Sequence, residues 1–376
     1  MQLDDIFRID WRNLTHALGA AEDVPQQILG LMSDKASARA QVLNQLYSTI
    51  WHEGMVFEAT AYAVPFLIQL LEHPNVQEKD QVLVLLSNLA SGQAPVDVMS
   101  STKESGQEQA GLPNAATQRR WAYDTYKTVM RGISVFIRLL EKGKLEERIA
   151  APYVLSCFDS EADKLTPILI SMLKKEQDPS VQGSILMCLG TFVSSGSKYE
   201  SVLLSYAEAK HPRIVRAMAA LAVGRISLER SPTFIVRMLI DILNHDDSNL
   251  ETAYQRLPWA NGSLAANTAL LVCVVGEEHA RWAYPDLMRA LTYADGRNAQ
   301  MILQALLLTL FPEPSQNNGE TVSRNSLSAR QFDLLDAVAN HDLLWARNFE
   351  VSAQLRSFGL PDWPEKIQTF LARRTT

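Results

Sequence analysis

The chain has 376 residues, of which 47% are hydrophobic and 20% charged, and this composition supplies enough apolar surface for a packed core and excludes wholesale disorder. Its formal net charge of -7 repels phosphate and argues against nucleic acid as the partner. Apolar stretches such as residues 61–71 fall short of the ~20 residues that span a bilayer, and the first residues lack the basic and apolar parts of a secretory signal. We therefore expect a cytoplasmic protein with no membrane segment.

In chain order, the sequence alternates two kinds of predicted helix. Helices of the first kind carry a Pro, Ser or Thr near the start of an apolar run, and they are predicted at residues 64–71, 134–140, 166–173, 232–239 and 285–291. Helices of the second kind begin around His73, Leu145, Asp178, His211 and Arg297. Two helices per unit, repeated along the chain, indicate stacked helical hairpins.

The repeat is clearest in residues 178–190 and 211–224. Both segments have a proline near the start, a valine two or three residues later and a glycine at the end, and they recur after 33 or 34 residues. The apolar residues between follow the i, i+4, i+8 spacing of one buried helical stripe. No stretch alternates with a period of two. The sequence thus predicts an all-α fold, a right-handed α-solenoid of HEAT-like or armadillo-like hairpins.

We expect one solenoid over residues 1–376. Its predicted parts are N-terminal repeats (1–90), a flexible polar loop (91–114), central repeats (115–311), a second loop (312–326) and C-terminal capping helices (327–376). The predicted core of the last part comprises Phe332, Leu334, Leu335, Val338, Leu343, Leu344, Phe349, Leu355 and Phe370.

The N-terminal part contains Trp-His-Glu-Gly at residues 51–54, then Phe-Glu-Ala-Thr at 57–60 and Ala-Val-Pro-Phe-Leu at 63–67. This pattern resembles a bacterial family of HEAT-repeat proteins of the PBS-lyase HEAT-like type. The resemblance is best over residues 8–90 and continues loosely to 225. It implies the fold and a general role in protein interaction, with no established chemistry to carry over.

Trp51, His52, Glu53 and Glu58 form the most suggestive cluster, because an imidazole beside carboxylates can bind a metal or move a proton. A zinc-protease helix requires a second histidine four residues on, and position 56 is valine, so no metal site is predicted. In the structural alternative, Gly54 ends one helix, Trp51 packs at the turn and Glu58 favours the start of the next helix.

Tyr254, Arg256 and Trp259 interrupt the helical rhythm near a turn and are of the residue types enriched at binding hot spots. Alternatively, the tryptophan fills a gap where two repeats mismatch. Arg138 and Arg237 are predicted on the concave side, where they either bind an acidic partner or are simply solvated.

Catalysis has no visible motif. The sequence lacks a Gly-x-Ser-x-Gly elbow and the phosphate-binding glycine loops, and no cysteine has a histidine beside it. His245, Asp246 and Asp247 are typical of a solvated loop, and the calcium-loop pattern is absent. We predict no catalytic residue and no cofactor.

The leading hypothesis is therefore a non-catalytic scaffold that binds another protein or peptide on the concave face of the solenoid, in one version as an immunity or inhibitor protein. The first alternative is a HEAT-like DNA glycosylase or another nucleic-acid-binding solenoid, against which the negative charge counts. The second is a chaperone-like lyase subunit, for which no chromophore pocket can be recognised.

Overall fold

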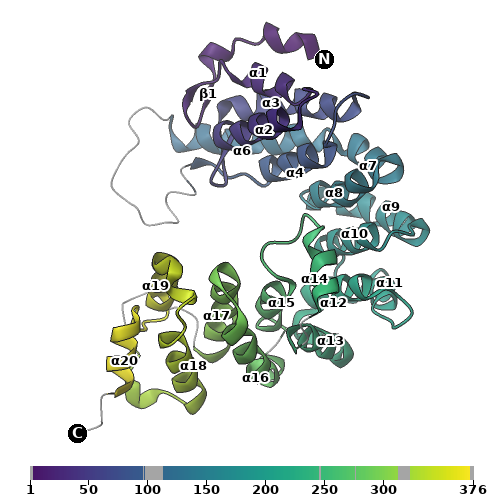
Figure 1. The fold of residues 1–376 in the computed structure, drawn as a ribbon. Coiled ribbons are helices and arrows are strands. Elements are labelled where there is room, and N and C mark those ends of the chain that lie inside the picture. Colours follow the sequence, from purple (N-terminus) through teal and green to yellow (C-terminus); the bar gives the residue numbers. More distant parts are fainter. Residues whose placement is uncertain are drawn as a thin grey trace. The chain divides into compact units, whose positions relative to one another are not determined.

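The computed structural model describes residues 3–95, 97, 113–244, 247–275, 277–311 and 322–372. Most of the two predicted loops, 91–114 and 312–326, and the residues His245 and Asp246 lie outside the described residues. The chain forms two compact units, Met1–Glu176 and Gln177–Thr376, and each is described by itself. Both are built from packed helices, so the predicted all-α class is confirmed (Figure 1). In the described part of the chain, every helix is too short or too polar to cross a membrane.

The N-terminal unit contains the helices predicted at residues 64–71, 134–140 and 166–173 and the one predicted to begin around Leu145, while the helix predicted to begin around His73 begins at Lys79. Its α-helices are α1 (Val24–Gly30), α2 (Ala36–Thr49), α3 (Glu58–Glu72), α4 (Lys79–Ala90), α6 (Ala115–Met130), α7 (Ile133–Lys142), α8 (Leu145–Leu155) and α9 (Ala162–Lys175). The short 3-10 helices are η1 (Leu3–Arg8), η2 (Trp11–Asn13) and η3 (Asp159–Glu161). Helix α3 packs on α4 and α6, α4 packs on α8, and α7 packs on α8.

This unit also contains two small β-hairpins that the sequence does not predict. Strands β1 (Thr15–His16) and β2 (Gly19–Ala20) pair, as do β3 (Trp51–His52) and β4 (Met55–Val56). The prediction that Gly54 ends a helix is wrong, because α2 already ends at Thr49. Glu53 (φ 49) and Gly54 (φ 86) form a two-residue hairpin turn, which requires this left-handed backbone.

Two contacts fix the chain on either side of residues 98–112. Before this segment, the Gln93 N–H donates to Gly54 O (2.8 Å) and Gln93 O accepts from the Val56 N–H (3.0 Å), which adds Gln93 to the edge of the β3–β4 hairpin. Asp97 then accepts two hydrogen bonds from Arg119 of α6, from Nη2 (2.7 Å) and Nε (2.9 Å). These contacts hold Gln93 against the hairpin and Asp97 against α6.

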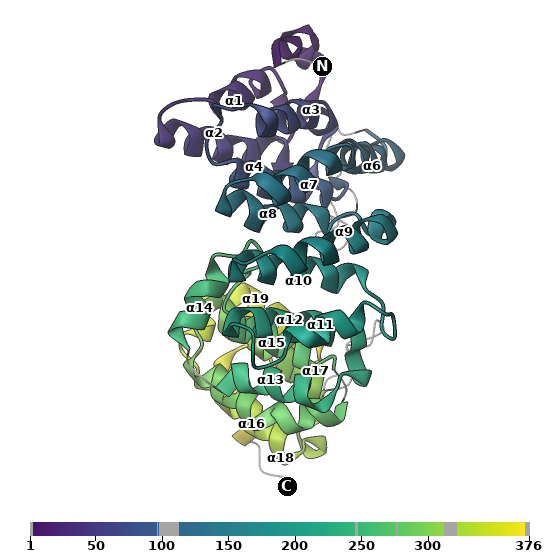
Figure 2. The same cartoon turned by 90° about the vertical axis from the view of Figure 1, so that its right-hand side faces the viewer.

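The C-terminal unit is a two-layered stack of helices. It comprises α10 (Pro179–Phe192), α11 (Glu200–Tyr206), α12 (Arg213–Ser227), η4 (Leu228–Arg230), α13 (Thr233–Asn244), α14 (Ser248–Gln255), α15 (Leu264–Val272), α16 (Glu277–Tyr293), α17 (Gly296–Leu310), η5 (Arg324–Ser326), α18 (Ala329–Ala339), η6 (Leu344–Arg347), α19 (Asn348–Ser357) and α20 (Pro364–Ala372). Helices α10, α12, α15, α17 and α19 pack in this order and form the inner layer; α11, α13, α16 and α18 form the outer layer (Figures 1 and 2).

The repeat seen in the sequence corresponds to α10 and α12. Asp178 caps α10 by accepting hydrogen bonds from the N–H groups of Ser180 (2.9 Å) and Val181 (3.2 Å), and Pro179 occupies the first turn. The two recurring glycines mark helix contacts within the inner layer. A Cβ on Gly190 would lie 2.9 Å from Ala222 Cα, and one on Gly224 would lie 2.9 Å from Leu271 Cδ2.

The C-terminal helices confirm only part of the predicted core. Leu334, Leu335, Val338, Leu344 and Leu355 are buried. Phe332 and Leu343, in contrast, are 37% and 59% exposed, so their prediction as core residues is wrong. At about 100° per residue, Phe332 lies to one side of the stripe of α18 formed by the buried Leu334, Leu335 and Val338. Phe370 is half-buried, and the side chain of Phe349 lies outside the described residues.

Asp362 connects α19 to α20. Its carboxylate accepts hydrogen bonds from Lys366 Nζ and Arg356 Nη1, both at 2.8 Å, and its main-chain oxygen accepts one from Ser352 Oγ (2.8 Å). The hydrogen bond from Lys366 is the main cause that holds the pKa of Asp362 below its usual value. The charged form is therefore the one that the fold favours.

We expect Asp362→Asn to lower the free energy of unfolding by about 1 kcal/mol at pH 7, since both basic partners are largely exposed. Because the folded-state pKa is lowered, this stabilisation is present above the ordinary aspartate pKa of about 3.9 and is lost as pH falls through the folded-state value. Urea unfolding at several pH values measures it, with Glu365→Gln as the control. If the free energies of unfolding of the wild type and Asp362→Asn still differed at pH 2, the charge of Asp362 would not be the cause of that difference.

Candidate functional site

The predicted cluster at residues 51–58 is distributed along a hairpin and a helix start. Trp51 is half-buried and meets the Tyr47 ring edge-on, with ring centroids 5.7 Å apart. Glu53 is exposed in the turn, His52 is half-buried in β3, and Glu58 begins α3, where its carboxylate accepts a hydrogen bond from Thr15 Oγ1 (3.3 Å). In the described part of the chain, no group of three or more His, Cys, Asp or Glu residues is placed to hold a metal ion.

The two predicted arginines lie in different units. Arg138 of α7 forms an ion pair with Glu72 of α3, and both side chains are about half-exposed. Arg237 is exposed on α13, which belongs to the outer layer of the C-terminal unit. Its predicted place on the concave side is wrong, because Ile235 and Leu239 are the buried side of α13 and pack toward α12 and α15.

Tyr254 and Trp259 make internal contacts. Tyr254 is 1% exposed, its hydroxyl donates to Trp259 O (3.2 Å), and burial raises its pKa to about 12. The indole N–H of Trp259 donates to Ser184 Oγ of α10 (3.0 Å), while Arg256 is exposed. The sequence leaves two interpretations of Trp259, a contact for a partner or a side chain that fills a gap between two repeats. Its hydrogen bond to α10 agrees with the second.

The segment 256–263 is also held by contacts at its C-terminal end. Gly262 has φ +89, and a Cβ there would lie 2.9 Å from Asn298 Oδ1, so only glycine fits. The Ser263 N–H donates to Asn298 Oδ1 (2.7 Å), and the Leu264 N–H donates to Glu251 Oε2 (3.0 Å). This segment therefore covers the surface of the inner layer next to Ser184.

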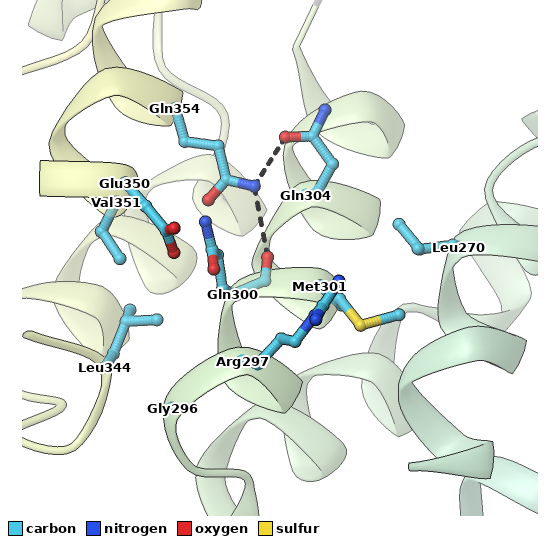
Figure 3. A pocket seen from close by; sticks show the side chains of 10 residues that line it. All are labelled: Leu270, Gly296, Arg297, Gln300, Met301, Gln304, Leu344, Glu350, Val351 and Gln354. Atoms are coloured by element: carbon cyan, nitrogen blue, oxygen red, sulfur yellow. Dashed lines mark hydrogen bonds between the residues drawn. The ribbon is translucent and has the colours of Figure 1, made fainter. Parts of the chain in front are cut away.

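Farther along the inner layer, between α17 and α19, lies a pocket of about 410 Å³ that we call the amide pocket (Figure 3). Its lining consists of Leu270, Gly296, Arg297, Gln300, Met301, Gln304, Leu344, Glu350, Val351 and Gln354. Three of these side chains are amides. The apolar side chains of Leu270, Met301, Leu344 and Val351 surround them.

Gln354 is the central polar group of the amide pocket. Its Nε2 donates to Gln304 Oε1 (2.7 Å) and to the main-chain oxygen of Gln300 (3.3 Å). Its Oε1 is buried and has no hydrogen-bond partner among the described residues. An unpaired buried acceptor costs about 1–3 kcal/mol, so a ligand N–H that reached this oxygen would be favoured.

The amide pocket also carries charges of both signs. Arg297 lies in the first turn of α17 and Glu350 in the first turn of α19, and Figure 3 shows the Glu350 carboxylate directed toward Gln300. Both side chains are exposed, and within the described ranges neither forms an ion pair. A ligand with both a cationic and an anionic group would complement this lining.

The sequence does not predict this pocket. Gln300 and Gln304 are four residues apart on one helix face, which is the only local signal. Gln354 is 50 residues farther along the chain, and nothing in its neighbourhood distinguishes it from a solvated glutamine.

Two of the described cysteines, Cys157 and Cys273, are poor nucleophiles. Burial is the main cause that raises the pKa of Cys157, and burial raises the pKa of Cys273 to about 11. Both thiols therefore stay protonated at neutral pH, when only a thiolate would be reactive.

The comparisons with known proteins concern mainly the repeats. No curated protein matches the chain. A similar solved structure is that of Kap121p bound to RanGTP, with 12% identity and a TM-score of 0.32; the match covers 89% of this chain and 41% of that one. The family model described as HEAT repeats matches residues 166–254. The stretch that contains α10 and α12 is therefore identified as HEAT repeats.

Proposed function

We propose that the protein is a non-catalytic scaffold and that its amide pocket binds an extended segment of a partner protein. The observation that carries this proposal is the buried, unpaired Gln354 Oε1 beside the side chains of Gln300 and Gln304. Its general basis is the HEAT-repeat architecture, since stacked helical hairpins present a long surface on which successive helices can contact one partner.

A peptide main chain is a ligand whose hydrogen-bond donors and acceptors match those of three glutamine side chains. Each peptide group has one N–H donor and one C=O acceptor, and each glutamine side chain offers the complementary pair. A segment that lies across α17 and α19 would donate an N–H to Gln354 Oε1 and accept from Gln300. The apolar atoms of Met301, Leu344 and Val351 would pack against its side chains.

The charges of the pocket suggest the sequence of that segment. An acidic residue would face Arg297 and a basic residue Glu350, because opposite charges give orientation and specificity to a docked chain. Whether the partner is a toxin or enzyme that the scaffold inhibits is a further proposal, and it rests on analogy with other solenoids. A nucleic acid is disfavoured, since Glu350 offsets the single arginine of the lining.

The test starts from a library of random 12-residue peptides selected on the immobilised full-length protein. For the selected peptides, we expect Gln354→Leu to weaken the Kd about tenfold, which corresponds to one lost hydrogen bond. Isothermal titration calorimetry measures the Kd, and Gln41→Leu, an exposed glutamine on α2, is the matched control.

N-methylation of the peptide provides the second arm of the experiment. Methylating the one peptide nitrogen that donates to Gln354 should cause the same tenfold loss with the wild type and none with Gln354→Leu, as a double-mutant cycle requires. The proposal is overturned if no peptide is selected, or if every selected peptide binds Gln354→Leu as tightly as the wild type. A free amino acid that displaced the peptide would instead indicate a small-molecule site.

A further inference from the structure

A second hollow of the C-terminal unit differs from the amide pocket in its chemistry. We call it the apolar groove; its volume is about 720 Å³, and helices α13 to α17 all contribute to it. Its floor is formed by Ile242, Leu250, Leu264 and Ile302. Such an apolar hollow with a few polar groups around it is the usual form of a binding site.

Small side chains explain why the groove is open. Ala265 of α15, Ala290 of α16 and Ala294, which follows α16, line it, and each leaves space that a leucine at the same position would fill. Tyr293, the last residue of α16, stands at the groove and is 84% exposed. Large aromatic side chains are seldom left so exposed, and tyrosine is among the residues most enriched at binding hot spots.

Acidic residues outnumber basic ones around the groove. Asp247 caps α14 and pairs with Arg213 Nε (3.1 Å), and Glu251 accepts hydrogen bonds from the Leu264 N–H and from Gln255. These two carboxylates therefore have protein partners.

Asp295 is different, because it precedes α17, makes no side-chain cap and is exposed without an ion pair in the described part of the chain. Arg289, the one basic residue of the lining, pairs with Asp286 (3.3 Å). The groove thus presents an apolar floor next to an aromatic ring and one carboxylate that is available to a cation.

We propose that the apolar groove docks a short segment of a partner protein in which a leucine-like side chain is followed closely by lysine or arginine. The apolar side chain enters the floor, which is the favourable way to remove it from water. The cation reaches Asp295 and packs over the ring of Tyr293. Phosphate-bearing ligands are excluded, since three carboxylates line the groove and its single arginine is paired.

The experiment uses fluorescein-labelled 12-residue peptides of Gly and Ser that carry Leu-Leu-Gly-Lys at their centre. Matched peptides have Glu in place of Lys, or Ser in place of both Leu residues. Fluorescence anisotropy with the full-length protein measures the Kd. We expect the Leu-Leu-Gly-Lys peptide to bind at least tenfold more tightly than either matched peptide.

Variants then assign the site. Asp295→Lys should reverse the preference, so that the Glu peptide binds more tightly than the Lys peptide. Glu229→Lys, which makes the same change of net charge on an exposed residue of the same unit, should leave the preference unchanged. Ala290→Phe fills the groove and should abolish binding, and thermal melting followed by circular dichroism shows whether it still folds.

Two further variants test the site even if Ala290→Phe does not fold, and distinguish it from the amide pocket. Tyr293→Ser alters an exposed side chain and should weaken binding about tenfold, even if Ala290→Phe fails to fold. Gln354→Leu should have no effect, which separates this site from the amide pocket. The proposal is overturned if the Lys peptide does not bind, if the Glu peptide binds as well, or if Asp295→Lys behaves like Glu229→Lys.

Discussion

Gly190→Val should lower the free energy of unfolding of the C-terminal unit by about 3 kcal/mol, since overpacking costs typically 1–3 kcal/mol and sometimes more. The first carbon of the new side chain would lie 2.9 Å from Ala222 Cα and 3.0 Å from Ala222 Cβ. A neighbouring side chain can rotate away, but a helix backbone must move as a whole. The substitution therefore separates α10 from α12.

Urea unfolding and hydrogen exchange measure this effect. In a stack of repeats each helix pair contacts only its neighbours, so we expect the loss of amide protection to be greatest in α10 and α12 and to decline with distance. Thr191→Val is the matched control, because Thr191 is exposed on the same helix. Equal effects of the two variants would mean that the close approach of the helices does not determine stability.

Tyr254→Ala should cost about 4 kcal/mol, in the range for removal of a large buried aromatic side chain. Tyr254→Phe should cost about 1 kcal/mol, the value of the hydrogen bond to Trp259 O. Chemical unfolding at pH 7 measures both. If Tyr254 instead served mainly as a contact for a partner, Tyr254→Ala would weaken partner binding and leave stability unchanged.

The pH dependence of Tyr254→Phe adds an independent check. Because the folded-state pKa of Tyr254 is raised to about 12, from the ordinary value of about 10, the neutral phenol is the form that the fold favours. Stability from this group is complete below about pH 10 and is lost as pH rises toward 12. The wild type should therefore lose more stability than Tyr254→Phe over that interval.

The helices and their repeat could be predicted because their signals are local. The prolines and glycines at 178–190 and 211–224, with apolar residues at helical spacing between them, are enough to predict α10 and α12. The hairpin at residues 51–56 was missed because its strands have two residues each, too few for a period of two to appear.

The candidate sites depend on contacts between distant residues, and this is why the sequence did not reveal them. Trp259 could be recognised as unusual, but its partner Ser184 lies 75 residues earlier. Gln354 can be recognised as a candidate binding residue only when the fold places it beside Gln300 and Gln304. In the sequence, Asp295 looks like an ordinary helix-capping residue. It becomes a candidate binding residue only because it lines the apolar groove, to which five helices contribute.

The ion pair between Asp97 and Arg119 has a consequence for how the chain can vary. Since it joins Asp97 to α6, the chain before residue 98 and the helix after residue 112 are held together by a contact outside residues 98–112. Doubling the length of a flexible connection costs only about 0.6 kcal/mol in chain entropy. Insertions, deletions and even an additional domain can accumulate at this point of the gene without altering the repeats.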